Sequence, residues 1–170
     1  MPRYEIVPDR SQVWIDASSS LHPIRSRTDG VVGFVDLAVE GSGVDLAAGV
    51  TGELSLPVAR LSSGNALEDR ELQRRIEARR FRTIDGRLTE IRATGTDGRY
   101  RVRGDVTFRG VTRSYEDEMT IRELDDGTVQ LEGQATFDIR DFGMEPPRIL
   151  LLRVHPEVDV RVAIVARKED

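Results

Sequence analysis

Strict alternation of apolar and polar residues is the feature that most limits what this chain can fold into. It runs through four long stretches, which are residues 52–58, 100–108, 129–139 and 158–166. A period of two places one set of side chains on a buried face and the other set in water, which is the pattern of a half-buried strand. Strands of a parallel sheet are instead continuously apolar. The sequence therefore predicts an antiparallel sheet.

Turn signals between the alternating runs predict a meander of neighbouring strands. The clearest is the dipeptide Arg-Gly at residues 109–110. If it forms a two-residue turn, Arg103 lies opposite Glu116 on the outer face and Tyr115 lies opposite Gly104 on the inner face. Opposite charges then pair outside and an aromatic ring covers a glycine inside, which is favourable cross-strand pairing.

One segment departs from the period of two and predicts a single α-helix over about residues 66–79. Asn65 is a favoured N-cap, and a carboxylate follows three residues later. Leu67, Leu72 and Ile76 then form a narrow apolar stripe. Arginines crowd the C-terminal half, where cations suit the helix dipole. We expect this helix to lie over the sheet.

About eight strands, one helix and no visible linker predict one all-β domain over residues 1–170. A closed antiparallel barrel and a two-sheet sandwich both satisfy the alternation. Four glycines fall inside the expected strands, where they relieve the bending of a curved sheet: Gly33, Gly52, Gly104 and Gly133. They favour the barrel.

Composition excludes several classes of function. The formal net charge is −5, with 25 basic and 30 acidic side chains, so general nucleic-acid binding is not expected. There is no cysteine and there are two histidines, His22 and His155. A metal site would need carboxylates such as Glu145 or Glu157 beside them, and no metal-ligand spacing is present, so we expect neither a metal nor a cofactor. No apolar run reaches the roughly 20 residues of a membrane span, and the N-terminus shows no secretion signal, which predicts a cytoplasmic protein.

The order of segments resembles the YceI-like family. The resemblance is carried by residues 4–15, by Ser63-Gly-Asn65 through Phe81-Arg-Thr-Ile84, by Gly104-Asp-Val-Thr-Phe-Arg-Gly110 and by Arg140-Asp-Phe-Gly143. It implies a lipocalin-like, eight-stranded antiparallel barrel that holds a long-chain amphiphile, such as an isoprenoid or a fatty-acid derivative. It brings no catalytic residues, so the expected activity is binding without chemistry.

The inward positions of the expected strands supply the candidate ligand-binding wall. These positions are Val13, Ile15, Leu54, Leu56, Val102, Val106, Phe108, Tyr115, Asp117, Met119, Leu131, Phe137, Val160 and Val162. A tube of this kind suits a slim apolar chain. The same pattern also fits an ordinary filled core, which periodicity alone favours; the family resemblance favours the hollow interior.

Two charged residues sit at inward positions of the second strand of the hairpin. Arg113 and Asp117 lie about 13 Å apart on one extended strand, too far for an ion pair. Each would then need another partner, such as a ligand headgroup, because buried unpaired charges are costly. The alternative is a bulge after Gly110 that turns one of them outward.

Three alternatives remain open at this point. Asp117 with His22 or His155 could serve an isomerase or hydrolase inside the barrel. A solid barrel could instead bind a protein partner. Trp14 points outward, which indicates either an interface, such as that of a homodimer, or cover from another segment.

Overall fold

Strands make up most of the structure, a computed structural model that describes residues 1–41, 43–149 and 151–170. The strands are β1 (Arg3–Ile6), β2 (Gln12–Ser19), β3 (Ile24–Thr28), β4 (Val32–Asp36), β5 (Val39–Glu40), β6 (Gly43–Val44), β7 (Thr51–Pro57), β8 (Thr83–Ala93), β9 (Arg99–Phe108), β10 (Val111–Glu123), β11 (Val129–Asp138), β12 (Arg148–Ile149) and β13 (Leu152–Lys168). The helix α1 spans Ala66–Ile76, and short 3-10 turns include Leu46–Ala48, Val58–Arg60 and Ile139–Phe142. The four alternating runs thus fall in β7, β9, β11 and β13.

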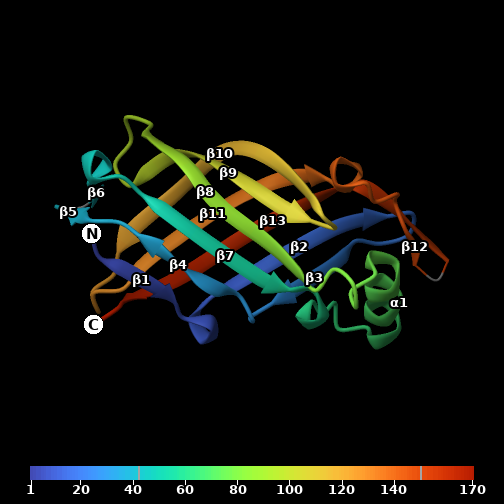
Figure 1. Ribbon diagram of the computed structural model, residues 1–170. Coiled ribbons are helices and arrows are strands. Elements are labelled where there is room, and N and C mark those ends of the chain that lie inside the picture. Colours follow the sequence, from blue (N-terminus) through green and yellow to red (C-terminus); the bar gives the residue numbers. More distant parts are fainter. Residues whose placement is uncertain (42, 150) are drawn as a thin grey trace.

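Eight strands close into a barrel. They follow the order β1-β4-β7-β8-β9-β10-β11-β13, and β1 pairs with β13 to complete the ring. All of these pairings are antiparallel. β2 and β3 continue the wall beside the long strand β13 (Figure 1). The barrel prediction is confirmed. The sandwich alternative is wrong, because in a sandwich β1 and β13 would be unpaired edge strands, whereas here they pair with each other.

The central hairpin has the predicted register. Arg103 lies opposite Glu116 and Tyr115 lies opposite Gly104. The Arg103 guanidinium is 3.3 Å from the Glu116 carboxylate on the outer face. Residues 109 and 110 both have positive φ, 53° and 74°, as a tight hairpin turn of two residues requires.

The helix begins where the sequence predicts and ends earlier. The Asn65 side chain accepts hydrogen bonds from the backbone N–H groups of residues 67 and 68, as an N-cap does. Glu77 adopts the left-handed conformation and ends the helix at Ile76, not at residue 79. The expected stripe is wrong at Leu67, which is 61% exposed, because the buried side of the first turn carries Glu68 instead.

The two ends of the barrel are built differently. The termini and the β5–β6 hairpin lie at one end, which we call the filled end, and α1 and β12 lie at the other, the helix end (Figure 1). At the filled end, large side chains such as Tyr4, Tyr100 and Ile121 pack into one buried cluster. The Tyr100 hydroxyl accepts a hydrogen bond of 2.8 Å from the backbone N–H of Val44, which ties the β5–β6 hairpin to the wall. The fold thus leaves the helix end as the place for a cavity.

Trp14 lies on the outer face of β2, as predicted. The Arg161 guanidinium of the neighbouring strand stacks over its ring at 4.1 Å from the centroid. This arginine supplies part of the cover that an outward tryptophan needs. The homodimer stays a prediction.

Candidate functional site

An apolar cavity of about 260 Å³ occupies the barrel between its middle and the helix end. Nine of the fourteen predicted residues line it: Val13, Ile15, Leu54, Leu56, Val106, Phe108, Phe137, Val160 and Val162. Among its lining residues only Ser26 and Asp85 are polar, and Asp85 alternates with the inward Gly86, so its carboxylate lies on the outer face of β8. Apolar cavities of about 150 Å³ already stay dry and accept small hydrocarbons. The volume and chemistry therefore suit a slim apolar chain.

Small side chains keep this part of the barrel open. β13 contributes only valines to the middle of the cavity wall, and Gly86 of β8 adds no side chain at all. A Cβ atom at Gly86 would point at Leu54, 3.4 Å from its Cγ atom. Gly86 does not have a positive φ, so its backbone conformation does not require glycine. The effect of having no side chain here is to leave space in the cavity.

Side chains outside the predicted set close the cavity at the helix end. They include Leu61, Leu72 and Ile76 from the helix segment, and Met144 and Ile149 from the segment before β13. Prediction from strand alternation missed them because they do not lie on the alternating strands. The apolar stripe of the expected helix was the signal for Leu72 and Ile76.

Five predicted residues lie elsewhere, which corrects their expected placement. Val102, Met119 and Leu131 belong to the buried cluster that contains Tyr4, Tyr100 and Ile121, and they do not line the cavity. Tyr115 packs against Phe142 and Phe137 beside the cavity. Asp117 is exposed. Alternation assigns a residue to the inner face, but it does not say how far along the barrel axis that residue lies.

The barrel wall has a seam between β10 and β11. Their register ends at the pair Met119 and Gly133. In a continued register Tyr115 would lie opposite Phe137, and the rings of these two residues meet edge to face with centroids 4.6 Å apart. An aromatic contact thus replaces the backbone ladder along this part of the wall.

The Tyr115 hydroxyl anchors the seam to the short turn after β11. It donates a hydrogen bond of 3.2 Å to the Asp141 carboxylate. Burial, together with the nearby Asp141 charge, raises the pKa of Tyr115 to about 12. The phenol is therefore neutral and a hydrogen-bond donor at all physiological pH values.

The seam also explains the two inward charges of β10. Arg113 and Asp117 keep their inward register opposite β9, with no bulge after residue 110. Both are exposed, because the wall is open beside them. The Arg113 Nε group donates to the backbone carbonyl of Asp141 at 3.0 Å, and the Asp117 carboxylate accepts from the backbone N–H of Glu118 at 2.8 Å. The bulge alternative is wrong, and the polar groups border the seam.

The histidines do not assemble with Asp117. The His22 Nε2 atom lies 3.7 Å from a Glu68 carboxylate oxygen, between the β2–β3 turn and the helix. His155 is exposed on β13. Across residues 1–41, 43–149 and 151–170 no hydrogen bond or ion pair joins Asp117 to either histidine, and no group of three His, Asp or Glu side chains is placed to hold a metal ion.

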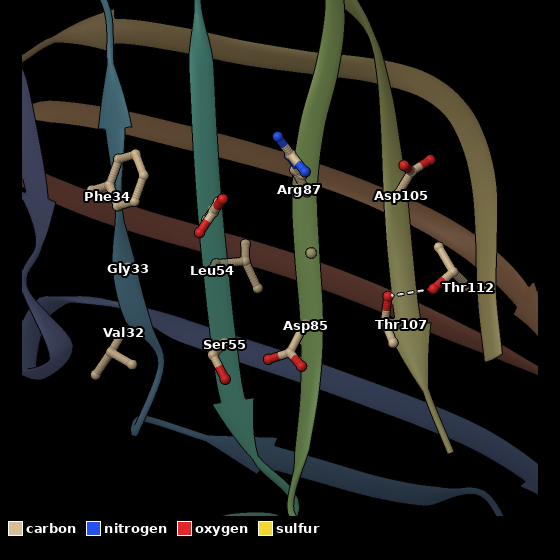
Figure 2. A pocket seen from close by; sticks show the side chains of 12 residues that line it. Val32, Gly33, Phe34, Leu54, Ser55, Asp85, Arg87, Asp105, Thr107 and Thr112 are labelled. Atoms are coloured by element: carbon tan, nitrogen blue, oxygen red, sulfur yellow. Dashed lines mark hydrogen bonds between the residues drawn. The ribbon is translucent and has the colours of Figure 1, made fainter. Parts of the chain in front are cut away.

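A second hollow, of about 450 Å³, lies outside the barrel over β4, β7, β8 and β9 (Figure 2). Its side chains include Phe34 and Arg87 together with the carboxylates of Glu53, Asp85 and Asp105. Figure 2 shows Asp85, Arg87 and Asp105 projecting from neighbouring strands. Glu53, Asp85 and Arg87 are exposed to solvent. Because water can reach such groups, this hollow gains little from burying an apolar ligand. The inner cavity is the better candidate site.

Comparisons with known proteins agree with this architecture. Residues 4–166 match the family model described as the YceI-like domain. The chain belongs to the YceI-like family. Within the described residues of this YceI-like protein, none of the helices has the length and apolar character needed to cross a membrane. No curated protein gave a match.

Three solved structures illustrate the shared fold. Burkholderia cenocepacia BcnA superposes with a TM-score of 0.80 at 14% identity, covering 95% of this chain and 99% of that one. A polyisoprenoid-binding domain from Saccharophagus degradans, implicated in plant cell wall breakdown, gives 0.78 at 14% identity over 98% of both chains. A Campylobacter jejuni YceI protein gives 0.69 at 14% identity over 86% of both chains. At 14% sequence identity, these three similarities show a shared fold and nothing more specific.

Proposed function

We propose that this protein binds a hydrophobic or amphipathic small molecule, isoprenoid or fatty-acid-like, without chemical change. The observation that carries the proposal is the apolar cavity inside the barrel, which is lined almost entirely by aliphatic and aromatic side chains. Family membership supports it, as does the polyisoprenoid-binding character of the Saccharophagus relative. The apolar tail of the ligand occupies the cavity and gains about 0.8 kcal/mol per buried methylene.

The seam between β10 and β11 is the place for the polar end of the ligand. Phe137 lines the cavity and also contacts Tyr115 at the seam. The two places are therefore adjacent, and one ligand can have its tail in the cavity and its headgroup at the seam. Arg113 and Asp117 border the seam and are exposed to solvent. A headgroup held there keeps its charge or hydroxyl groups in water while the tail stays dry.

Native mass spectrometry of freshly purified protein tests the proposal. A stoichiometric adduct of lipid mass, identified by extraction, is the expected result. Val106→Trp places an indole in the cavity and should abolish the adduct. Val32→Trp is the matched control, because Val32 lies on the outer face and is 51% exposed. A bare wild type that also rejects added lipids would overturn the proposal and favour a solid-core interaction module.

Asp117→Asn separates binding from catalysis. A headgroup contact predicts weaker retention, by about 1–2 kcal/mol for a lost charge-assisted hydrogen bond. A catalytic base would instead leave binding intact and abolish conversion, with a pH profile that reports its ionisation. The extracted ligand is incubated with both proteins, and its mass and isomer composition are followed. Conversion by the wild type alone would contradict binding without chemistry.

A further inference from the structure

Three exposed leucines gather at the helix end of the barrel. Leu21 is 76% exposed, Leu67 61% and Leu151 91%. They belong to three separate elements, which are the β2–β3 turn, the first turn of α1 and the β12–β13 turn. Single exposed leucines are ordinary, but a group of them at one place marks an interaction surface.

Contacts between the three elements bring these leucines to the same place. The His22 side chain, next to Leu21, lies 3.7 Å from Glu68, next to Leu67. Ser20 and Arg153 exchange two hydrogen bonds, of 3.0 and 3.1 Å, which join the β2–β3 turn to the β12–β13 hairpin. Figure 1 shows α1 beside β12 at this end, away from both termini. The same elements close the cavity, through Leu72 and Ile149.

The helix end is basic although the chain is acidic. Residues 20–28, 60–82 and 145–155 hold eleven arginines and five carboxylates, a net charge of +6. The whole chain carries −5, so the rest of the molecule carries −11. Positive charge and exposed leucine side chains are thus both concentrated at the helix end.

Several of these arginines lack an acidic partner. In the part of the chain that the structure describes, no ion pair involves Arg25, Arg70, Arg148 or Arg153. Arg148 and Arg153 also lie directly opposite each other in the β12–β13 ladder, and both are exposed. Like charges in this arrangement repel each other. A negatively charged surface would relieve the repulsion.

We propose that the helix end docks on the surface of an anionic lipid bilayer, where the cavity takes up or releases its ligand. The docking face consists of Leu21, Leu67 and Leu151, with Arg70, Arg148 and Arg153 around them. Leucines enter the boundary between headgroups and acyl chains while arginines bind lipid phosphates. The proposal rests on the proposed function, because a lipid ligand gives the protein a reason to visit a membrane.

The leucines favour a bilayer over the other polyanions that an arginine cluster could bind. Nucleic-acid binding would depend on the arginines and on salt, but not on the exposed leucines. A second copy of the chain would present the same positive charge and would be repelled at this face. Both alternatives give distinct outcomes in the experiment.

Vesicle flotation at low salt tests the docking face. Wild-type protein is expected to float with vesicles that contain about one-third phosphatidylglycerol in phosphatidylcholine, and not with phosphatidylcholine alone. Leu67→Ser with Leu151→Ser should weaken binding roughly tenfold, and Val32→Ser is the matched control on the outer face. Arg148→Gln with Arg153→Gln should weaken it about fivefold per arginine, and Arg167→Gln is the control near the C-terminus.

A fluorescent label gives a second measurement that does not depend on loss of binding. The chain has no cysteine, so Leu151→Cys accepts one polarity-sensitive dye. Its emission should shift to the blue when anionic vesicles are added, whereas a dye at Val32→Cys should not respond. Absence of wild-type flotation, equal responses of the two dyes, or binding that ignores both leucines would overturn the proposal. Loss of self-association in the leucine variant, with vesicle binding unchanged, would assign the face to a second copy instead.

Failure of docking and failure of the proposed function are distinguishable. A protein that carries a lipid adduct but ignores vesicles overturns the docking proposal alone. A protein that floats with vesicles but never carries lipid overturns the function of the cavity, and with it the reason given for docking.

Discussion

The filled end and the helix end of this barrel use the same alternating strands for different purposes. At the filled end Tyr4, Tyr100 and Ile121 are buried in one hydrophobic cluster. Toward the helix end, valines and Gly86 face one another, and the cavity remains between them. Side-chain size along the axis, and not the strand pattern, decides which part of a small barrel is core and which is a binding site.

Truncation of one isoleucine at each end gives the largest expected difference. Ile121→Ala removes a side chain that is 1% exposed in the filled end and should cost about 2–5 kcal/mol of unfolding free energy. Ile15→Ala enlarges a cavity that already exists, and it should cost roughly 1–2 kcal/mol in delipidated protein. Chemical denaturation measures both. Equal losses would show that the helix end is as tightly packed as the filled end.

Overpacking tests the same comparison from the opposite direction. Leu131→Trp forces an indole into the filled end and should cost about 1–3 kcal/mol. Val106→Trp enters open space and should cost less, while it blocks lipid uptake. Thermal melts of the two delipidated variants, run with the wild type, give the comparison. A Val106→Trp protein destabilised as much as the Leu131→Trp protein would argue against an open cavity.

Tyr115→Phe should have the smallest effect, about 0.5–1.5 kcal/mol for the lost hydrogen bond to Asp141. The folded pKa of about 12 exceeds the ordinary value of 10.0, so the folded state holds the phenolic proton more tightly. The resulting stability is complete below pH 10 and is lost as the pH rises from 10 to about 12. Denaturation curves across this alkaline range should fall less steeply for the phenylalanine variant. Parallel curves would contradict the assignment.

Much of the fold could be predicted because its signals are local. The alternating runs and the turn at residues 109–110 were enough to predict the register of the central hairpin, as the Arg103–Glu116 pair confirms. The Asn65 cap likewise set the start of the helix. The helix face was harder, since Leu67 and Glu68 are adjacent and hydrophobicity alone chose the wrong one.

The cavity could be predicted only in part, because its limits depend on long-range geometry. Alternation placed Val106 and Leu131 on the same inner face, but only the structure shows that Val106 lines the cavity and that Leu131 does not. The seam did leave a trace in the sequence. Arg113 and Asp117 occupy inward positions where a closed wall would bury them unpaired, and the structure opens the wall beside them.

The contact between Tyr115 and Phe137 also has a kinetic consequence. Opening a wall held by backbone hydrogen bonds requires local unfolding, which is slow and costs much of the stability of the sheet. Here a side-chain contact holds the wall, so opening it requires rotation of the two rings and loss of one side-chain hydrogen bond, while the ladders on either side stay intact. Under the proposed function, exchange of a bound molecule through this seam depends on ring rotation and on the hydrogen bond to Asp141, and not on the global stability of the barrel.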